Sequence, residues 1–401
     1  MNKINKVFLF GFLFSLIATA IYFTGCTNDD QEIDLWEPPI AEVPSASELV
    51  SAKTTIVPSI DGVIDDAWDN ATKLFTSTEV PDPGNKVFAG YEGNRNEVTL
   101  RSMYDNENIY FLAEWSDAEL SFNRQTWYFD PIENLWKQEL RVPVFNDDGV
   151  IIRQPFYEDK FSFLFNVDNS VANWNAQTCY ASCHTDVGAE GGYARHYTQP
   201  GETIDMWHWK GVRTNVNGQA DDQYQDDTQP NGRHSDDKDS GGYTNNIQEL
   251  MVMGTTETVM VPKYFIPARE YYYWITQSEI DAGTAKLITS VNSNGDLGYD
   301  GGTINSSDLD FQREGSTTAA KCIPSIYTAP FVGSRGDIEA RGQFMGSGWV
   351  LELKRRLDTG ETAKQDVNFS SLETMAFGIA VFDNAGIAHG TKAGLTLRFA
   401  E

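Results

Sequence analysis

Short segments in which apolar and polar residues alternate follow one another along most of the chain. A period of two residues is typical of half-buried β-strands, and Gly, Asn, Asp and Pro separate these segments as they do in turns. Helical periodicity is limited to a short turn expected at 65–72 (DDAWDNAT). The pattern predicts an all-β protein with a single β-sandwich and long loops. The strand-like segments are 96–105 (NEVTLRSMYD), 108–117 (NIYFLAEWSD), 159–168 (DKFSFLFNVD), 348–357 (GWVLELKRRL), 375–384 (MAFGIAVFDN) and 393–401 (AGLTLRFAE).

The first 25 residues have the pattern of an export signal. Lys3 and Lys6 precede an apolar run at 7–23, and Thr24 and Gly25 precede Cys26. A basic start, an apolar stretch and small residues before a cysteine indicate a lipoprotein signal, so we expect cleavage before Cys26 and lipidation of its thiol. The alternative is an uncleaved membrane anchor, for which this apolar run is at the short limit.

The next segment, 26–53, is rich in proline and acidic residues and predicts a flexible tether to a folded domain at 54–401. Its first residues after Cys26, TNDDQE, resemble the acidic sequence that directs some lipoproteins to the outer face of the outer membrane. We therefore expect a lipid-anchored protein of the cell envelope, attached to the outer membrane and either periplasmic or exposed at the surface.

The chain is strongly acidic, with a formal net charge of −28. This charge argues against nucleic acid as a partner, because nucleic-acid binding depends on basic side chains that neutralise phosphates. Residues 217–246 contain seven aspartates and almost nothing apolar, which predicts a solvated polar loop inserted in the sandwich. A calcium site in this loop is the alternative, since calcium prefers oxygen ligands, although the spacing does not match a twelve-residue calcium loop.

The segment 178–185, TCYASCHT, carries the most specific chemistry of the chain. Cys179, Cys183 and His184 differ from the haem-attachment pattern C-x-x-C-H by one extra residue between the thiols. Covalent haem, a disulfide and a zinc site remain open, but zinc would need a fourth ligand from elsewhere. With Cys26 lipidated, an odd number of thiols remains, and haem attachment would leave only Cys322 without a covalent role. The odd number of thiols therefore favours haem attachment over a disulfide.

Three stretches resemble one family. The segment 205–215 (DMWHWKGVRTN) resembles the D-x-W-x-W-K motif of the haem-binding domain of the ethylbenzene dehydrogenase γ subunit, also described as a cytochrome c-552/dimethyl sulfoxide reductase-like haem-binding domain. The segments 98–117 and 334–360 resemble its strand pairs, so the similarity extends over 54–401. The resemblance implies an immunoglobulin-like or DOMON-like sandwich with one haem between loops.

The resemblance also implies a ligand set for the iron, a methionine and a lysine. Lys210 matches the motif lysine and Met103 is the matching methionine, while Trp207 and Trp209 would supply an apolar wall that keeps the lysine neutral. The cysteine motif implies a second set, in which His184 binds the iron of a c-type haem.

The distal partner in this second set would be His389, with Met206 and His208 as further options. Each of these side chains also has an ordinary interpretation, as a surface cation, a core methionine or a hydrogen-bonded histidine. The covalent c-type haem is the preferred prediction and a non-covalent b-type haem is the alternative.

Two strong axial ligands would leave no open iron position, which predicts an electron carrier or a subunit of a redox complex. A cytochrome or a molybdenum oxidoreductase would be its redox partner. We expect no stand-alone enzyme, since catalytic motifs such as a P-loop or H-E-x-x-H do not occur.

A carbohydrate-binding module is the competing function. The segment 58–75 has the I-D-G-x-x-D-x-x-W pattern that opens family 9 carbohydrate-binding modules, with Asp61, Gly62 and Trp68 at the defined positions. Aromatic rings stacked on sugar faces would be the mechanism. A turn followed by a core tryptophan is the ordinary interpretation of the same pattern.

Overall fold

The computed structural model describes residues 47–82, 88–172, 174, 196–313 and 319–400. These residues belong to one compact unit that spans 44–401. The signal, Cys26 and the motif with Cys179, Cys183 and His184 lie outside the described residues. Within the described ranges, the structure contains no helix with the length and apolar character needed to span a membrane.

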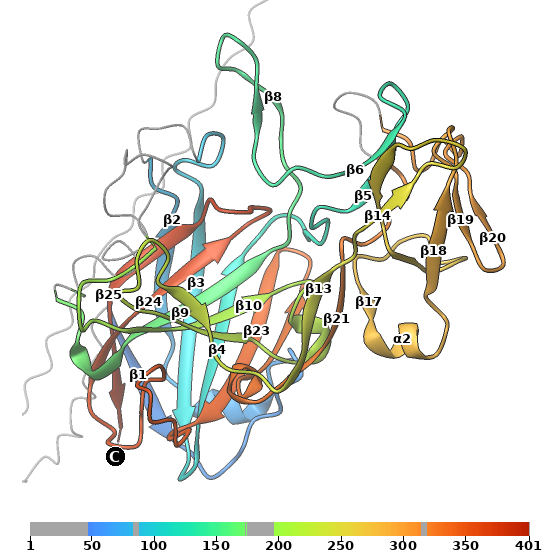
Figure 1. Cartoon of the computed structure of the whole chain (residues 1–401). Helices are drawn as coiled ribbons and strands as arrows, with labels where there is room; N and C mark the ends of the chain where they lie inside the picture. Colours follow the sequence, from blue (N-terminus) through green and yellow to red (C-terminus); the bar gives the residue numbers. More distant parts are fainter. Residues whose placement is uncertain (1–46, 83–87, 173, 175–195, 314–318, 401) are drawn as a thin grey trace, which may run out of the picture. The chain divides into compact units, whose positions relative to one another are not determined.

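A twelve-stranded sheet forms the main body of the protein (Figure 1). Its strands follow the order β12-β11-β10-β9-β24-β25-β1-β3-β4-β23-β22, and β2 pairs with β25 and β3. Their bounds are β1 Glu48–Lys53, β2 Leu74–Glu79, β3 Arg95–Tyr104, β4 Asn108–Ser116, β9 Lys160–Asn166, β10 Ile204–Lys210, β11 Asp221–Gln225, β12 Arg233–Ser235, β22 Glu339–Phe344, β23 Gly348–Arg356, β24 Met375–Phe382 and β25 Gly390–Phe399.

The two halves of this sheet pack face to face. Phe111 of β4 lies 4.8 Å, centroid to centroid, from Phe163 of β9 and 5.6 Å from Trp207 of β10. On the same inner faces, the rings of Trp209 in β10 and Trp349 in β23 are 5.0 Å apart. Aromatic side chains from both halves therefore build one core, and the protein is an all-β sandwich, as the alternating pattern predicts.

The strand pattern in the sequence corresponds closely to this sheet. Four of the six alternating segments contain β4, β9, β23 and β24, and the other two overlap most of β3 and β25. The short turn at 65–72 contains the 3-10 helix η1, Asp66–Asn70. Buried apolar residues on alternate positions account for this agreement, because one face of each strand must meet the core.

The predicted tether is wrong at its C-terminal end. Residues Glu48–Lys53 form β1, which pairs in parallel with both β25 and β3. Leu49 of this strand is fully buried in the core. The folded domain therefore includes β1 as an internal strand of the sheet.

The prediction of a solvated loop at 217–246 is also wrong. The segment contains β11, β12 and β13 (Ser240–Asn245), and Asp221 and Asp222 are fully buried. The aspartates were expected to face water because carboxylates are rarely buried without a partner. Here Lys210 and Arg335 pair with Asp221, and Arg355 lies 3.6 Å from Asp222.

Smaller sheets and short helices complete the domain. A second apolar cluster, which includes Trp127, Val261, Ile288 and Leu297, packs between several of them. The three-stranded sheet is β13-β21-β17 and the four-stranded sheet is β16-β18-β19-β20, while β5-β6, β7-β8 and β14-β15 are pairs. The remaining bounds are β5 Trp127–Asp130, β6 Leu135–Gln138, β7 Val144–Phe145, β8 Ile151–Arg153, β14 Gln248–Met251, β15 Thr258–Val261, β16 Tyr264–Phe265, β17 Ile275–Thr276, β18 Lys286–Val291, β19 Leu297–Tyr299, β20 Gly302–Ile304, β21 Ile326–Val332, α2 Gln277–Asp281, η2 Val167–Asn169, η4 Asn215–Asn217 and η5 Ser334–Gly336.

The I-D-G pattern near the start of the domain forms a turn anchored to the sheet. The backbone N–H groups of Asp61 and Gly62 donate hydrogen bonds to Oε2 of Glu352 in β23, at 3.0 and 2.8 Å. The indole N–H of Trp68 donates to Oε1 of the same carboxylate at 2.7 Å, and this tryptophan is fully buried. The pattern is therefore a turn followed by a core tryptophan, and Trp68 offers no surface to a sugar.

Candidate functional site: a cationic cavity

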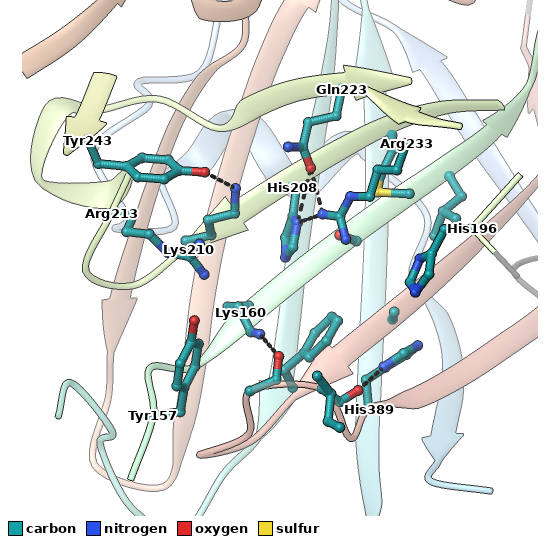
Figure 2. Close-up of a pocket in the computed structure, with 17 residues that line it drawn as sticks. Tyr157, Lys160, His196, His208, Lys210, Arg213, Gln223, Arg233, Tyr243 and His389 are labelled. Atoms are coloured by element: carbon teal, nitrogen blue, oxygen red, sulfur yellow. Dashed lines mark hydrogen bonds between the residues drawn. The ribbon is translucent and has the colours of Figure 1, made fainter. Parts of the chain in front are cut away.

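A cavity of about 350 Å³ lies on the face of β9, β10 and β24 that is turned away from the aromatic core (Figure 2). Strand alternation produces this division, because successive side chains point to opposite faces. On β10, Trp207 and Trp209 enter the core, whereas Met206, His208 and Lys210 line the cavity. The cavity residues are Tyr157, Lys160, Ser162, Leu164, His196, Met206, His208, Lys210, Arg213, Gln223, Arg233, Tyr243, Ala380, Phe382, Gly386, Ile387 and His389.

The charges around the cavity are opposite to the charge of the whole chain. Four of the lining residues are lysines or arginines and three are histidines, but none is an aspartate or a glutamate. The chain as a whole has almost twice as many acidic residues as basic ones. Such a concentration of cations in one hollow favours an anionic ligand.

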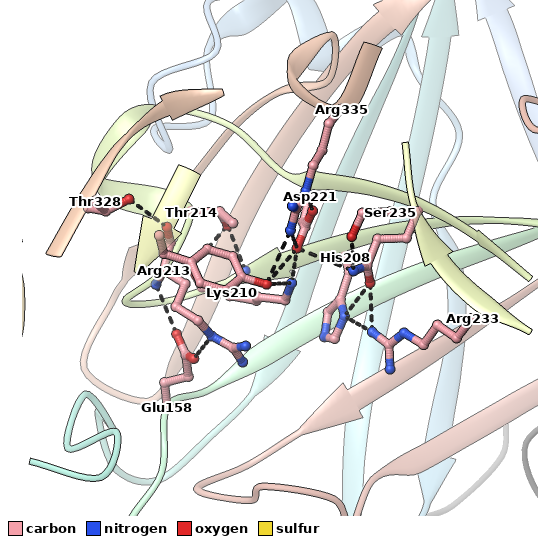
Figure 3. Close-up of polar contacts among 12 residues, drawn as sticks. Glu158, His208, Lys210, Arg213, Thr214, Asp221, Arg233, Ser235, Thr328 and Arg335 are labelled. Carbon is pink, nitrogen blue, oxygen red and sulfur yellow. Dashed lines mark hydrogen bonds and ion pairs between the residues drawn. The ribbon is translucent and has the colours of Figure 1, made fainter. Parts of the chain in front are cut away.

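Lys210 takes part in a buried ion pair (Figure 3). Its ammonium contacts the carboxylate of Asp221, and Arg335 binds the same carboxylate through Nε and Nη2. Burial opposes ionisation of Asp221, but the two cations hold its pKa below the usual range. A lysine needs a free amine to bind iron, and the amine of Lys210 is already engaged by Asp221.

Arg213 is positioned in the same manner by Glu158, which is fully buried. The backbone N–H groups of Val212 and Arg213 donate to Glu158 Oε2 at 2.7 and 3.0 Å, and Arg124 lies 3.5 Å from Oε1. Burial acts to raise the pKa of Glu158, yet Arg213 and Arg124 lower it overall. The carboxylate lies behind the cavity wall and fixes the guanidinium that faces the cavity.

Lys160 has a different environment. Its ammonium donates to the carbonyl of Gly386 at 3.0 Å and lies 4.0 Å from the ring centroid of Phe382. Among the described residues, no carboxylate lies within ion-pair distance of it. Burial and the nearby Arg213 place the pKa of Lys160 well below its usual value. An anion bound in the cavity would raise the pKa of Lys160 and so stabilise its charged form.

His208 is neutral and has a nitrogen available to the cavity. Burial, followed by the charges of Lys210 and Arg233, places its pKa well below the usual value. Arg233 Nη2 lies 2.7 Å from Nδ1, and a guanidinium can only donate, so Nδ1 accepts and the hydrogen is on Nε2. Nε2 is buried and has no hydrogen-bond partner among the described residues.

His389 has the opposite tautomer. Its Nδ1 lies 2.7 Å from the carbonyl oxygen of Ile387, which can only accept, so Nδ1 carries a hydrogen, and in the neutral ring Nε2 has the lone pair (Figure 2). The ring stacks on Phe382 with a centroid distance of 4.4 Å. Metal-binding histidines commonly donate their second N–H to a backbone carbonyl in this manner.

The structure brings some of the predicted residues together and separates others. Lys210 and His389 line the same cavity, as do Met206 and His208. Met103 is fully buried on β3 in a cluster with Trp68 and lines no part of this cavity. Met103 and Lys210 therefore do not face a common ligand.

Several cavity residues were not identified from the sequence. Lys160, Arg213 and Arg233 are the cations that sequence reasoning missed, together with His196. For Lys160 a signal exists, because it starts the run Lys160-Ser162-Leu164 that alternates with Phe161, Phe163 and Phe165 in β9. Arg213 and Arg233 come from loops and a short strand, where no period points to a common face.

Comparison with known families decides the classification. The family model described as "Ethylbenzene dehydrogenase" matches residues 65–394. This chain belongs to the ethylbenzene dehydrogenase family. No curated protein sequence matches it.

This ethylbenzene dehydrogenase family member also has similar solved structures. Two structures of a carbohydrate binding module family 9 from Caldicellulosiruptor kristjanssonii, in complex with cellotriose and with glucose, cover 88% of this chain. The similarity includes 93% and 95% of those chains, at 10% identity and a TM-score of 0.29.

Proposed function

We propose that this chain binds one haem in the cationic cavity and transfers single electrons. The observation that carries the proposal is the cavity itself, in which four cations and three histidines meet without a lining carboxylate. Haem has two propionate groups, for which Lys160 and Arg233 are suitable partners because neither forms an ion pair with a described carboxylate. The macrocycle would contact the apolar part of the wall, which includes Leu164, Phe382 and Ile387.

Among the cavity histidines, His389 is the side chain we assign to the iron. Its Nε2 has a lone pair, and the bond from Nδ1–H to Ile387 would hold the ring in place during a change of oxidation state. His208 would need the other tautomer to bind iron, which would turn an N–H toward Arg233. His208 is better suited to donate a hydrogen bond from Nε2 to the ligand.

Attachment through Cys179 and Cys183, with His184 as the second axial ligand, completes the proposal. Both described neighbours of the motif segment belong to the cavity region. His196 lines the cavity, and Trp174 packs in one cluster with Met206, which also lines it. A c-type haem anchored by these thiols and bound by His184 and His389 is therefore the arrangement that we propose.

A haem iron with two protein ligands supplies reversible one-electron exchange. Burial of the site and the nearby cations would favour the reduced form, because it carries less positive charge. We propose a redox protein as partner, a cytochrome or a molybdenum oxidoreductase, and lipid attachment at Cys26 in the cell envelope. The carbohydrate-binding alternative has less support, because Trp68 is buried and a neutral sugar would leave the excess positive charge of the cavity unbalanced.

Substitution of His389 tests the ligand assignment. In protein produced with c-type haem maturation, His389→Ala should convert a low-spin absorption spectrum to a high-spin or mixed one, while the thioether bonds retain the haem. The control is His234→Ala, which alters a half-exposed histidine paired with Asp226 outside the cavity lining. His208→Ala should remain low-spin. An unchanged spectrum in His389→Ala together with loss of the low-spin form in His208→Ala would reverse the assignment.

A further inference from the structure

A cluster of buried carboxylates lies on the side of β11 opposite to the cavity. Asp222 of β11, Asp236 directly after β12, and Asp366 between β23 and β24 each place a carboxylate oxygen within 4.8 Å of the others. The first two belong to the polar segment 217–246, and the third is distant in the sequence. Two oxygens bound to one calcium ion are separated by at most about 5 Å, so this spacing fits ligands of a common ion.

These carboxylates are buried without the hydrogen bonds that such burial requires. Asp222 is 0% exposed and Asp236 is 3% exposed. Both side-chain oxygens of Asp222, both of Asp366 and Oδ1 of Asp236 accept no hydrogen bond from a described N–H or hydroxyl group. Their nearest polar contacts include other carboxyls, Asp337 for Asp222 and Asp366 for Asp236. Buried polar atoms are almost always paired, and clustered unpaired oxygens are typical of groups that bind an ion or water. The five oxygens are therefore candidates for one cation.

One guanidinium is the only side-chain cation that the described structure places within 4 Å of the cluster. Arg355 Nη1 lies 2.9 Å from Asp205 Oδ2, 3.6 Å from Asp222 and 3.8 Å from Asp366. Burial and the mutual repulsion of the carboxylates raise the pKa of Asp236 to about 8 and place that of Asp222 well above its usual range. A single positive charge thus faces four buried acids, and a divalent cation would correct most of this imbalance.

We propose that Asp222, Asp236 and Asp366 form a binding site for one calcium ion. The ligands are hard oxygens, and two of the three side chains have both oxygens available for bidentate contact. Calcium accepts such irregular sets of six to eight oxygens, whereas magnesium requires near-octahedral geometry and retains several waters. A buried, carboxylate-rich site is therefore better suited to calcium.

The bound ion would join parts of the domain that the chain connects only at long range. It would fix the connection between β23 and β24, through Asp366, to the hairpin of β11 and β12. This hairpin also carries Gln223 and Arg233 on its other side, where both line the cavity. Calcium would therefore stabilise the wall of the cavity from behind, and this proposal stands independently of which ligand the cavity binds.

Calcium titration of the full chain after treatment with EDTA tests the proposal. Isothermal titration calorimetry should give one site with a Kd at or below about 1 mM, the weak end of the range for extracellular calcium modules. Calcium should also raise the melting temperature, since it binds only the folded state. Asp366→Asn, in a connection outside the strands, should weaken calcium binding at least tenfold and remove most of the thermal shift.

The matched control is Asp237→Asn, which removes the same charge from the exposed neighbour of Asp236. It should bind calcium like the natural chain. If Asp222→Asn does not fold, Asp366→Asn and Asp236→Asn still decide the outcome, with circular dichroism as the test of folding. The proposal is overturned if the natural chain shows no site at 10 mM calcium, in which case protons shared among the carboxyls balance the cluster. Equal affinity in Asp366→Asn and in the natural chain would also overturn it.

Discussion

Glu352 is the residue on which the opening turn of the domain depends. Its carboxylate accepts three hydrogen bonds, from the backbone of Asp61 and Gly62 and from the indole of Trp68. In Glu352→Gln, an NH2 group replaces one of the acceptor oxygens and meets an N–H donor, with which it cannot form a hydrogen bond. Leaving buried donors unpaired costs about 1–3 kcal/mol. We expect the free energy of unfolding to fall by this amount, measured by urea denaturation.

Glu339→Gln is the control for this prediction, because Glu339 is exposed and, among the described residues, forms an ion pair with Lys354 alone. It should change stability little, since surface ion pairs contribute about 0–1 kcal/mol. Equal stability of Glu352→Gln and the natural chain would mean that the turn is held by other contacts.

A second residue-scale prediction concerns Asp117 and Asp159. Burial and, next, Asp117 raise the pKa of Asp159 to about 8, while burial and Asp383 raise that of Asp117 to about 7. A folded-state pKa above the unfolded value means that the folded protein binds more protons. Stability from these groups is therefore present at pH 4 and is lost as the pH rises toward 8. In Asp117→Asn, the decrease in melting temperature between pH 5 and pH 8 should be smaller.

The reason is that the variant removes one buried charge, and its amide can donate to Asp159 instead of repelling it. Thermal melts in EDTA at both pH values give the comparison, and Asp147→Asn on an exposed loop serves as the control. Parallel pH profiles for Asp117→Asn and the natural chain would show that the two carboxyls do not interact.

The sequence identified single residues where a motif or a period marked them. The sequence predicts a ligand-binding role for Lys210 and His389, and both line the cavity. Their roles could not be derived in the same manner. The partner of Lys210 is Asp221 of the next strand rather than Asp205 of its own strand, because Asp205 faces the core and binds Arg355. Such pairings depend on which strands become neighbours.

At the scale of elements, β1 is the strand that the sequence did not predict, because the composition of segment 26–53 is typical of a tether. It lies between β25 and β3, with Ser51 opposite both Phe399 and Ser102. A shortened chain that begins at residue 54 should therefore lose an internal strand and fail to fold. A chain that begins at residue 44 should fold. Soluble yield and the circular dichroism spectrum measure the difference. If both shortened chains fold equally well, β1 is not required for folding and the account of it as an internal strand is wrong.

The polar segment 217–246 shows why composition misled at this scale. A run of aspartates predicts exposure because an isolated buried carboxylate is costly. For Asp221 this cost is offset by cations, one of them far away in the sequence, since Lys210 and Arg335 bind its carboxylate. Asp222 lies 3.6 Å from Arg355 and remains only partly compensated. In contrast, β9 was predictable, because three phenylalanines on alternate positions define its core face within the strand itself.

At the scale of the whole molecule, the β10–β11 hairpin separates two regions of opposite charge. Lys210, His208 and Gln223 face the cationic cavity, whereas Asp205 and Asp222 face the carboxylate cluster. The sandwich and its family membership followed from patterns that extend over the chain. The cavity could not be read from the sequence, because it combines residues from Tyr157 to His389 that only the folded sheet brings together.

Acid–acetone extraction of the full-length protein, produced with c-type haem maturation, tests the central claim most directly. We predict a visible spectrum with haem that remains on the protein after extraction, and release of this haem in the double variant Cys179→Ala, Cys183→Ala. Haem that extracts from the natural chain would contradict covalent attachment while leaving the cavity as a non-covalent site. Protein that carries no haem under these conditions would contradict the proposed function as a whole.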